Sequence, residues 1–223
     1  MGLKLAIWDM DGTLVDSREV IQTAMERAFK GMGLPVPDYE ATRQTVGLDL
    51  AEVCRRLAPK DFAEDRVPDL VEAYKEAFIA RRTEPDFSEP LYDGTMEALQ
   101  ALREDNWLIA MATGKSHRGI RAIFEMHPPL KPFFDTIWCA DDGPGKPNPF
   151  MVEEAMKAVG AEPHESLMIG DATFDMMMGR AAGVRTLGVG WGFGKVEELE
   201  AAGADEVHHD FASLNKTLAA FGT

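Results

Sequence analysis

An apolar run over residues 5–8 ends abruptly in two aspartates one residue apart, Asp9 and Asp11, followed by Gly12. This pattern predicts a buried strand that leads into a tight turn, with both carboxylates at the carboxyl end of the strand. Open α/β sheets bind their ligands at that end. Because neighbouring carboxylates repel one another unless a cation or a proton neutralises them, we expect a hard metal ion such as Mg²⁺ beside them. A surface turn can carry the same two acids, whereas an EF-hand loop does not fit, because Leu14 stands where that loop requires glycine.

Short apolar segments rich in β-forming residues recur along the rest of the chain. With the first, they cover residues 4–9, 107–113, 134–140, 166–171, 184–190 and 205–208. From the second segment on, stretches of helical periodicity separate them, at residues 116–126, 150–159, 175–182 and 195–202. This alternation predicts a parallel sheet covered by helices on both faces, that is, a doubly wound, Rossmann-like α/β fold with right-handed crossovers.

The interval after the first strand breaks this alternation. Residues 16–84 contain no convincing strand, and apolar stripes of helical period predict helices at residues 18–31, 49–57 and 67–82. We therefore expect a small helical domain over residues 16–84, inserted into a catalytic core made of residues 1–15 and 85–223.

Two later strand ends carry groups that can bind a phosphoryl group or a metal ion. At the second, Thr113, Gly114 and Lys115 offer a hydroxyl and free backbone N–H groups at a strand-to-helix turn, which can cradle a phosphoryl group. A P-loop does not fit there, because Ile109 replaces its first glycine. At the fourth strand end, Asp171 and Asp175 are candidate metal ligands, although Asp175 can instead cap its helix.

In the sequence, Lys146 lies between the second and the fourth of these strands, on a loop at residues 143–149 that contains two glycines and is stiffened by three prolines. Taken alone, it would be interpreted as a solvated loop lysine. A compact ammonium group at this place can instead offset charge on a nucleophile and a phosphate.

These segments in this order resemble the haloacid dehalogenase superfamily, and the resemblance covers nearly the whole sequence. Residues 9–17 match the phosphatase form of its first motif, Asp-x-Asp-Gly-Thr-Leu-x-Asp-Ser. The resemblance implies that Thr113 binds the transferring phosphoryl oxygens, that Lys146 offsets their charge, and that Asp171 and Asp175 hold or orient Mg²⁺. Ala172 departs from the Ser or Thr that commonly stands there in the family, which removes a supporting hydrogen bond. The inserted helices resemble the helical cap of the family's first cap class.

The resemblance also implies an activity, Mg²⁺-dependent hydrolysis of a small phosphomonoester through an aspartyl-phosphate. Asp9 would be the nucleophile, and Asp11 would protonate the leaving oxygen and then activate water. Mg²⁺ would be held by the Asp9 carboxylate, the Asp11 backbone carbonyl and Asp171.

Within the superfamily, the chain looks most like the phosphoglycolate phosphatase group, judged by residues 12–17 and 45–48. Gly47 and Arg43 are the cap residues that we expect to bind substrate with Thr113, Gly114 and Lys115. Arg55 and Arg56 are further candidates for cap contacts. The mostly apolar segment 45–50 suggests a small substrate.

Three other functions remain open on the sequence. A sugar phosphomutase would share every core residue, because Asp11 can return the phosphoryl group to a sugar. A haloacid dehalogenase also attacks through the first aspartate, but that branch lacks the second, which argues against it here. A catalytically silent interaction protein would be expected to lose one of Asp9, Asp11, Lys146 and Asp171, and all four are present.

Charge and composition restrict the partners. A net charge of −15 over 223 residues argues against nucleic acid and a negatively charged membrane surface as partners. The two cysteines, Cys54 and Cys139, suit a reducing compartment, and no signal peptide or membrane span is apparent, so we expect a cytoplasmic monomer or small homo-oligomer. The glycine-rich segment 188–194 lacks dinucleotide-binding spacing, and we expect a loop there that has only a lesser chance of bordering the active site.

Overall fold

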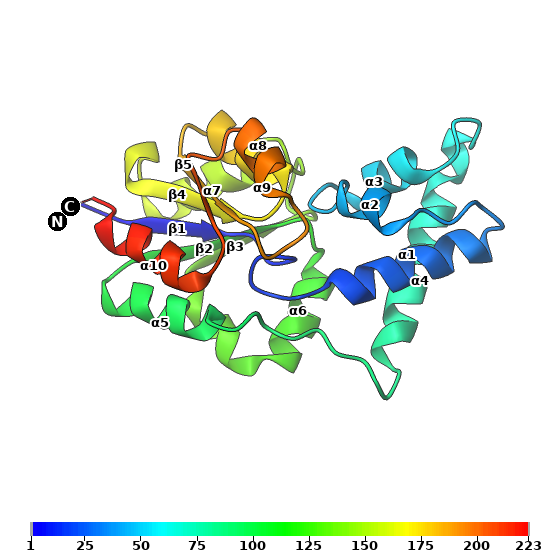
Figure 1. Ribbon diagram of the computed structural model, residues 1–223, viewed down its shortest axis with the longest axis horizontal. Coiled ribbons are helices and arrows are strands. Elements are labelled where there is room, and N and C mark those ends of the chain that lie inside the picture. Colours follow the sequence, from blue (N-terminus) through cyan, green and yellow to red (C-terminus); the bar gives the residue numbers. More distant parts are fainter. Residues whose placement is uncertain (1, 223) are drawn as a thin grey trace.

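The computed structural model, which describes residues 2–222, contains a six-stranded, fully parallel sheet (Figure 1). The strand order is β3-β2-β1-β4-β5-β6. The strands are β1 (Leu5–Trp8), β2 (Leu108–Thr113), β3 (Thr136–Cys139), β4 (Ser166–Gly170), β5 (Arg185–Val189) and β6 (Glu206–His208). The doubly wound α/β fold predicted from the sequence is therefore confirmed. In this order the connections reverse direction between β1 and β4, and such a switch point is where open parallel sheets bind ligands.

Both faces of the sheet are buried, which explains why its strands are continuous apolar runs. In β1, Leu5 and Ile7 point to one face and pack with Met151 and Val152. Ala6 and Trp8 belong to the cluster on the opposite face. All four residues of β1 are fully buried, so β1 is a central strand that fixes the position of whatever follows it.

Helices cover the two faces. Helices α7 (Phe150–Val159) and α8 (Thr173–Ala181) lie on the face that carries Leu5 and Ile7, and α9 (Val196–Ala201) packs beside α8 (Figure 1). The opposite face is covered by α5 (Thr95–Glu104), α6 (His117–Met126) and α10 (Phe211–Ala220). Two short 3₁₀ helices complete the core, η2 (Pro128–Phe133) and η3 (Pro163–Glu165). Helices α5 and α10 were not predicted from the sequence, although Leu99 and Leu102 of α5 have helical spacing and are buried.

The helices between β1 and α5 form a separate group beyond the carboxyl end of β1 (Figure 1). They are α1 (Arg18–Gly31), α2 (Tyr39–Arg43), α3 (Leu50–Leu57), η1 (Glu64–Arg66) and α4 (Val67–Arg82). Helix α1 packs along α4, and Met25, Phe29 and Leu70 are buried between the helices of this group. Asp49 caps α3 by accepting a hydrogen bond from the Ala51 N–H at 2.9 Å. We call this group the cap.

The two chain segments that join cap and core run side by side. Val15 and Leu91 form an isolated antiparallel bridge, and the Tyr92 N–H donates to the Leu14 carbonyl at 3.0 Å. In the sequence, the first of these segments, at Leu14 and Val15, follows Asp9 and Asp11 within a few residues. Any movement of the cap about these segments would therefore act next to Asp9 and Asp11.

None of the helices within residues 2–222 combines the length and apolar character that a membrane crossing requires. Cys54 and Cys139 are both buried and carry free thiols. Burial raises the pKa of each thiol to about 12, so both remain protonated near neutral pH.

Candidate active site

Three buried carboxylates meet at the switch point of the sheet. Asp9 directly follows β1 and Asp171 directly follows β4, and the two strands are paired up to Trp8 and Ile169. The Asp9 N–H continues this ladder by donating to the Ile169 carbonyl at 2.9 Å. Carboxylate oxygens of Asp9, Asp171 and Asp175 lie within 4.8 Å of one another. Parallel pairing of β1 with β4 therefore brings together acids that are 162 positions apart in the chain.

The Asp171 side chain is held from two directions. Its Oδ1 accepts a hydrogen bond from the Thr13 hydroxyl at 2.9 Å, and its Oδ2 accepts one from the Phe193 N–H at 2.7 Å. A β-carbon on either Gly12 or Gly192 would lie 2.2 Å from Oδ2, so only glycine fits at both places. The glycine-rich segment 188–194 thus borders the site directly. From the sequence this segment was interpreted mainly as a loop after the fifth strand, because nothing in the segment itself indicates which carboxylate its N–H group contacts.

Lys146 is buried, with 3% of its surface exposed. Its Nζ lies 2.7 Å from Asp9 Oδ1 and 2.6 Å from Asp175 Oδ1. The interpretation as a solvated loop lysine is therefore wrong, and the ammonium group lies beside the candidate nucleophile. Asp175 also accepts a hydrogen bond from the Ala172 N–H at 2.9 Å through its other oxygen. Asp175 thus caps α8 and fixes the ammonium of Lys146.

Burial, and then the proximity of the acids to one another, shifts the pKa values of Asp9 and Asp171. Burial raises the pKa of Asp9 to about 7, against the lowering effect of Lys146. Burial also raises the pKa of Asp171 well above its ordinary value, and the nearby charges of Asp9 and Asp175 add to this. Buried carboxylates with raised pKa values are ligands that a divalent cation would return to the charged form.

The donors available here fit Mg²⁺. This ion prefers oxygen ligands and retains several waters, so it is usually bound through one or two carboxylates. Asp9 and Asp171 supply those carboxylates. Asp175 is the weaker candidate as a direct ligand, because one of its oxygens pairs with the Lys146 ammonium and the other caps α8. The hydrogen bonds that Asp171 accepts come from neutral donors, the Thr13 hydroxyl and the Phe193 N–H.

Asp11 belongs to a second charged network. Its Oδ1 lies 2.8 Å from the Nζ of Lys115, which also lies 3.3 Å from Glu89 Oε1. Glu89 in turn pairs with Arg82 at the end of α4, at 3.0 Å. Burial lowers the pKa of Lys115, but Asp11 and Glu89 together raise it above its ordinary value, so the ammonium stays charged. Glu89 was not predicted from the sequence, because an acid in a linker usually faces solvent, yet its side chain is fully buried.

The other predicted phosphoryl-binding residues lie near the two networks. Thr113 is buried at the end of β2, and its hydroxyl accepts a hydrogen bond from the Lys115 N–H at 3.2 Å. Gly114 and Lys115 line a cavity of about 560 Å³ between cap and core, together with Asp9 and Asp11. On the cap side, Gly47 also lines this cavity. Thr113 and Lys146 are buried and do not line this cavity.

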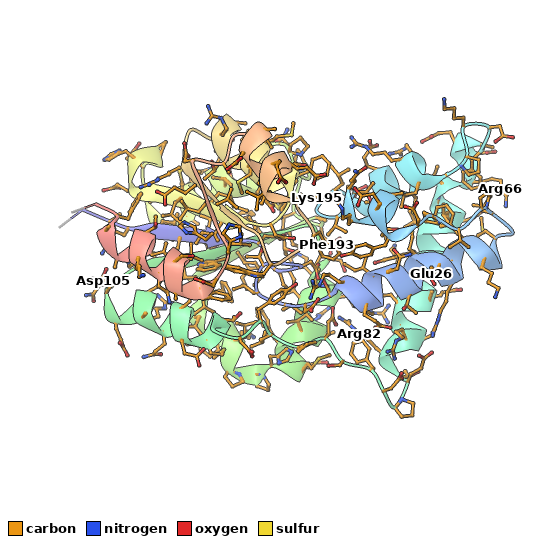
Figure 2. All side chains as sticks on the ribbon, in the orientation of Figure 1. Glu26, Arg66, Arg82, Asp105, Phe193 and Lys195 are labelled. Carbon is orange, nitrogen blue, oxygen red and sulfur yellow. The ribbon has the colours of Figure 1, made fainter. Side chains whose placement is uncertain are left out.

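Arg43 does not line this cavity. Its guanidinium pairs with Glu40 of the cap and with Glu198 of the core at 2.7 Å, and it donates to the Phe193 carbonyl at 3.2 Å. It therefore ties the cap to the core instead of facing substrate. Figure 2 shows Phe193 and Lys195 at this junction. Arg55 and Arg56 also point elsewhere, since they form ion pairs with Glu64 and Glu52 on the surface of the cap.

The chain belongs to the haloacid dehalogenase-like hydrolase family, whose family model matches residues 6–189. Among its relatives is "Probable phosphatase IndB" of Dickeya dadantii, 31% identical over 94% of this chain and 91% of that protein. A phosphoglycolate phosphatase of Pseudomonas putida is 28% identical over 95% of this chain and 78% of that one. The crystal structure of a "predicted phosphatase" from Clostridium acetobutylicum superposes with a TM-score of 0.85 at 25% identity, over 99% of this chain and 100% of that one. The protein is thus an enzyme of the phosphatase branch of the family, acting on phosphate esters.

Proposed function

We propose that the enzyme is a Mg²⁺-dependent phosphomonoester hydrolase that forms a phosphoaspartate at Asp9. The observation that carries this proposal is the buried contact of Lys146 with Asp9 at 2.7 Å, beside the carboxylate of Asp171. A structural ion pair would need one acid for one lysine. Three buried acids around one ammonium leave negative charge that only a further cation or protons can balance.

Asp9 attacks phosphorus in line, and the leaving oxygen departs on the opposite side. Lys146 stabilises the charge that develops on the phosphoryl oxygens, and the Thr113 hydroxyl and nearby backbone N–H groups bind the same oxygens. The Asp9 and Asp171 carboxylates and the Asp11 carbonyl would hold Mg²⁺, which would supply further positive charge to the reaction. Asp175 keeps Lys146 in place.

Asp11 acts as the general acid and base. It protonates the leaving oxygen, and as a carboxylate it then takes a proton from the water that cleaves the phosphoaspartate. Lys115, at 2.8 Å, orients the Asp11 side chain toward the cavity. Because Glu89 and Arg82 support Lys115, the position of Asp11 is linked to the end of the cap helix α4. Closure of the cap would exclude bulk water during the first step.

A screen of phosphomonoesters with Mg²⁺, with released inorganic phosphate as the readout, tests this proposal. We expect hydrolysis of at least one ester by the wild-type enzyme and none by Asp9→Asn. Phosphate release that is equal in the two proteins would refute it, as would the absence of release from every ester.

We predict that replacing Lys146 with methionine lowers kcat/KM by about 10²- to 10³-fold, because the phosphoryl charge loses a preorganised donor. The free energy of unfolding should also fall, since Asp175 then keeps a buried charge without its partner. Steady-state kinetics and urea denaturation measure the two effects. Lys157→Met, at an exposed lysine of α7, is the matched control and should change neither. A Lys146→Met enzyme with wild-type kcat/KM would show that this ammonium has only a structural role.

Hydrolysis can be separated from phosphoryl transfer to a second position of a sugar. A mutase cap needs polar groups that hold a sugar phosphate in two orientations, whereas apolar side chains such as Ile21, Val46 and Leu48 line this cavity on the cap side. We therefore predict that released phosphate accounts for essentially all substrate consumed, without a sugar bisphosphate primer. Phosphorus NMR of the complete reaction measures this balance. Conversion of a sugar 1-phosphate to its 6-phosphate with little free phosphate would instead identify a mutase.

A further inference from the structure

The cavity above Asp9 is large for a small phosphate ester. Its volume of about 560 Å³ falls within the range of pockets that enclose drug-sized ligands, roughly 300–1,000 Å³. The carboxylates of Asp9 and Asp11 belong to the core, whereas cap residues make up most of the cavity lining, so most of the space is available to the leaving group. An acid as small as glycolate would leave most of it filled with water.

This volume does not result from a cap that has swung away from the core. The cap segment around Gly47 already rests on the core, because a β-carbon on Gly114 would lie 3.0 Å from the Gly47 carbonyl oxygen. Leu48 packs in one cluster with Ala172 and Phe174 of the core. Ion pairs of Arg43 with Glu198 and of Lys195 with Glu40 close the same side. The cavity therefore persists with the cap in contact with the core.

The wall that the cap contributes is mostly apolar and includes two aromatic rings. Ile21 and Met25 come from α1, and Val71, Tyr74 and Phe78 come from α4. The rings of Tyr74 and Phe78 lie 5.9 Å apart at an interplanar angle of 46°. Apolar side chains of this kind favour a leaving group that buries apolar surface, and the rings favour a planar one.

The charges around the cavity disfavour an acidic leaving group. The cations on the cap wall within residues 2–222 are Lys75 and Arg82, and both have carboxylate partners. Lys75 pairs with Glu72 at 3.5 Å, and Arg82 pairs with the buried Glu89 (Arg82 is labelled in Figure 2). Arg118, from the core, also lines the cavity and is exposed to solvent. A carboxylate on the leaving group would thus enter a mostly apolar chamber without a free cap cation to bind it.

From these observations we infer that the preferred substrate is a phosphomonoester of a bulky, uncharged, apolar and preferably aromatic alcohol. The inference rests on the proposed phosphatase function and adds the class of leaving group. It departs from the small substrate suggested by the sequence, because the apolar segment 45–50 is only one wall of a chamber whose other walls come from α1 and α4.

Alkyl phosphates of similar leaving-group basicity test this inference, since they remove differences in intrinsic reactivity. We would compare kcat/KM for 2-(2-naphthyl)ethyl phosphate, ethyl phosphate and phosphoglycolate in Mg²⁺. The expected kcat/KM for the naphthylethyl ester is about 10- to 100-fold above that for either small ester, which corresponds to burial of one large apolar group. Equal or higher kcat/KM for ethyl phosphate or phosphoglycolate would overturn the inference and leave the phosphatase function standing. Failure to hydrolyse any of a wide panel of esters would overturn both.

Two cap variants assign the preference to this wall. Ile79 lines the cavity near its mouth and is 37% exposed, so Ile79→Asp should fold. Val36 is an exposed apolar residue of the cap outside the cavity lining, and Val36→Asp is the matched control. We expect Ile79→Asp to reduce the ratio of naphthylethyl to ethyl phosphate kcat/KM several-fold, and Val36→Asp to leave that ratio unchanged. An unchanged ratio in Ile79→Asp, or equal reductions in both variants, would contradict the assignment.

Discussion

Replacing Asp9 with asparagine is expected to reduce turnover by at least about 10⁴-fold, the scale of losing a nucleophile. An amide cannot attack phosphorus, and the neighbouring acids cannot replace it. Asp171 is fixed by the Thr13 hydroxyl and the Phe193 N–H, and Asp175 by Lys146 and the Ala172 N–H. Phosphate release under saturating ester and Mg²⁺ measures the effect.

The same variant should keep its fold. Burial raises the pKa of Asp9 from its ordinary value of 3.8 to about 7, so between these pH values the folded protein holds a proton that the unfolded chain has released. The stability contributed by this group therefore falls as pH rises from about 4 to about 7. Asparagine removes that dependence. Above about pH 7 without metal, we expect an Asp9→Asn midpoint of thermal unfolding no lower than that of wild type. Asp61→Asn, at an exposed acid of the cap, is the control for activity and should retain it. Appreciable turnover by a correctly folded Asp9→Asn enzyme would contradict the assignment of the nucleophile.

Removing divalent metal is expected to lower turnover by at least about 10³-fold, because the metal would supply several kcal/mol of charge stabilisation. Added Mg²⁺ should restore it. Ca²⁺ should inhibit, since a larger ion with more ligands at longer distances disturbs the in-line geometry.

A readout independent of activity exists for the same metal site. Mg²⁺ should raise the thermal midpoint of the wild-type protein by binding only the folded state. Asp171→Asn should abolish this rise, whereas Asp61→Asn should preserve it. Full activity in excess chelator, or an equal Mg²⁺ effect on the midpoint of Asp171→Asn, would contradict the metal site.

Local sequence was enough to predict the sheet and the strand ends. A buried parallel strand is an apolar run, and a polar residue that ends such a run is placed at the same edge of the sheet as every other strand end. Asp9 and Asp171 were therefore expected at the same edge of the sheet, and the pairing of β1 with β4, which the structure shows, places them side by side.

Contacts made across the chain were not predictable in this way. The burial of Glu89 depends on Lys115 and Arg82, which approach it only in the folded protein. Arg43 was predicted to contact substrate because it lies close to a cap motif, and its ion-pair partner cannot be recognised in the sequence. In the structure its guanidinium pairs with Glu198 of the core. Nothing in the sequence of either segment indicates that these side chains will pair with each other.

The most direct test of the central claim is to isolate the phosphorylated enzyme. Asp11→Asn lacks both the acid that protonates the leaving oxygen and the base that activates water. With an ester such as 4-nitrophenyl phosphate, whose leaving group departs without a proton, this variant should still phosphorylate Asp9, and the intermediate should accumulate. After acid quenching during turnover, peptide mass spectrometry should find one phosphoryl group on the peptide that contains Asp9, removable by hydroxylamine as expected for an acyl phosphate. Asp9→Asn treated in the same way should carry none. A phosphoryl group on a different residue, or its absence from Asp11→Asn enzyme that still consumes ester, would contradict the account.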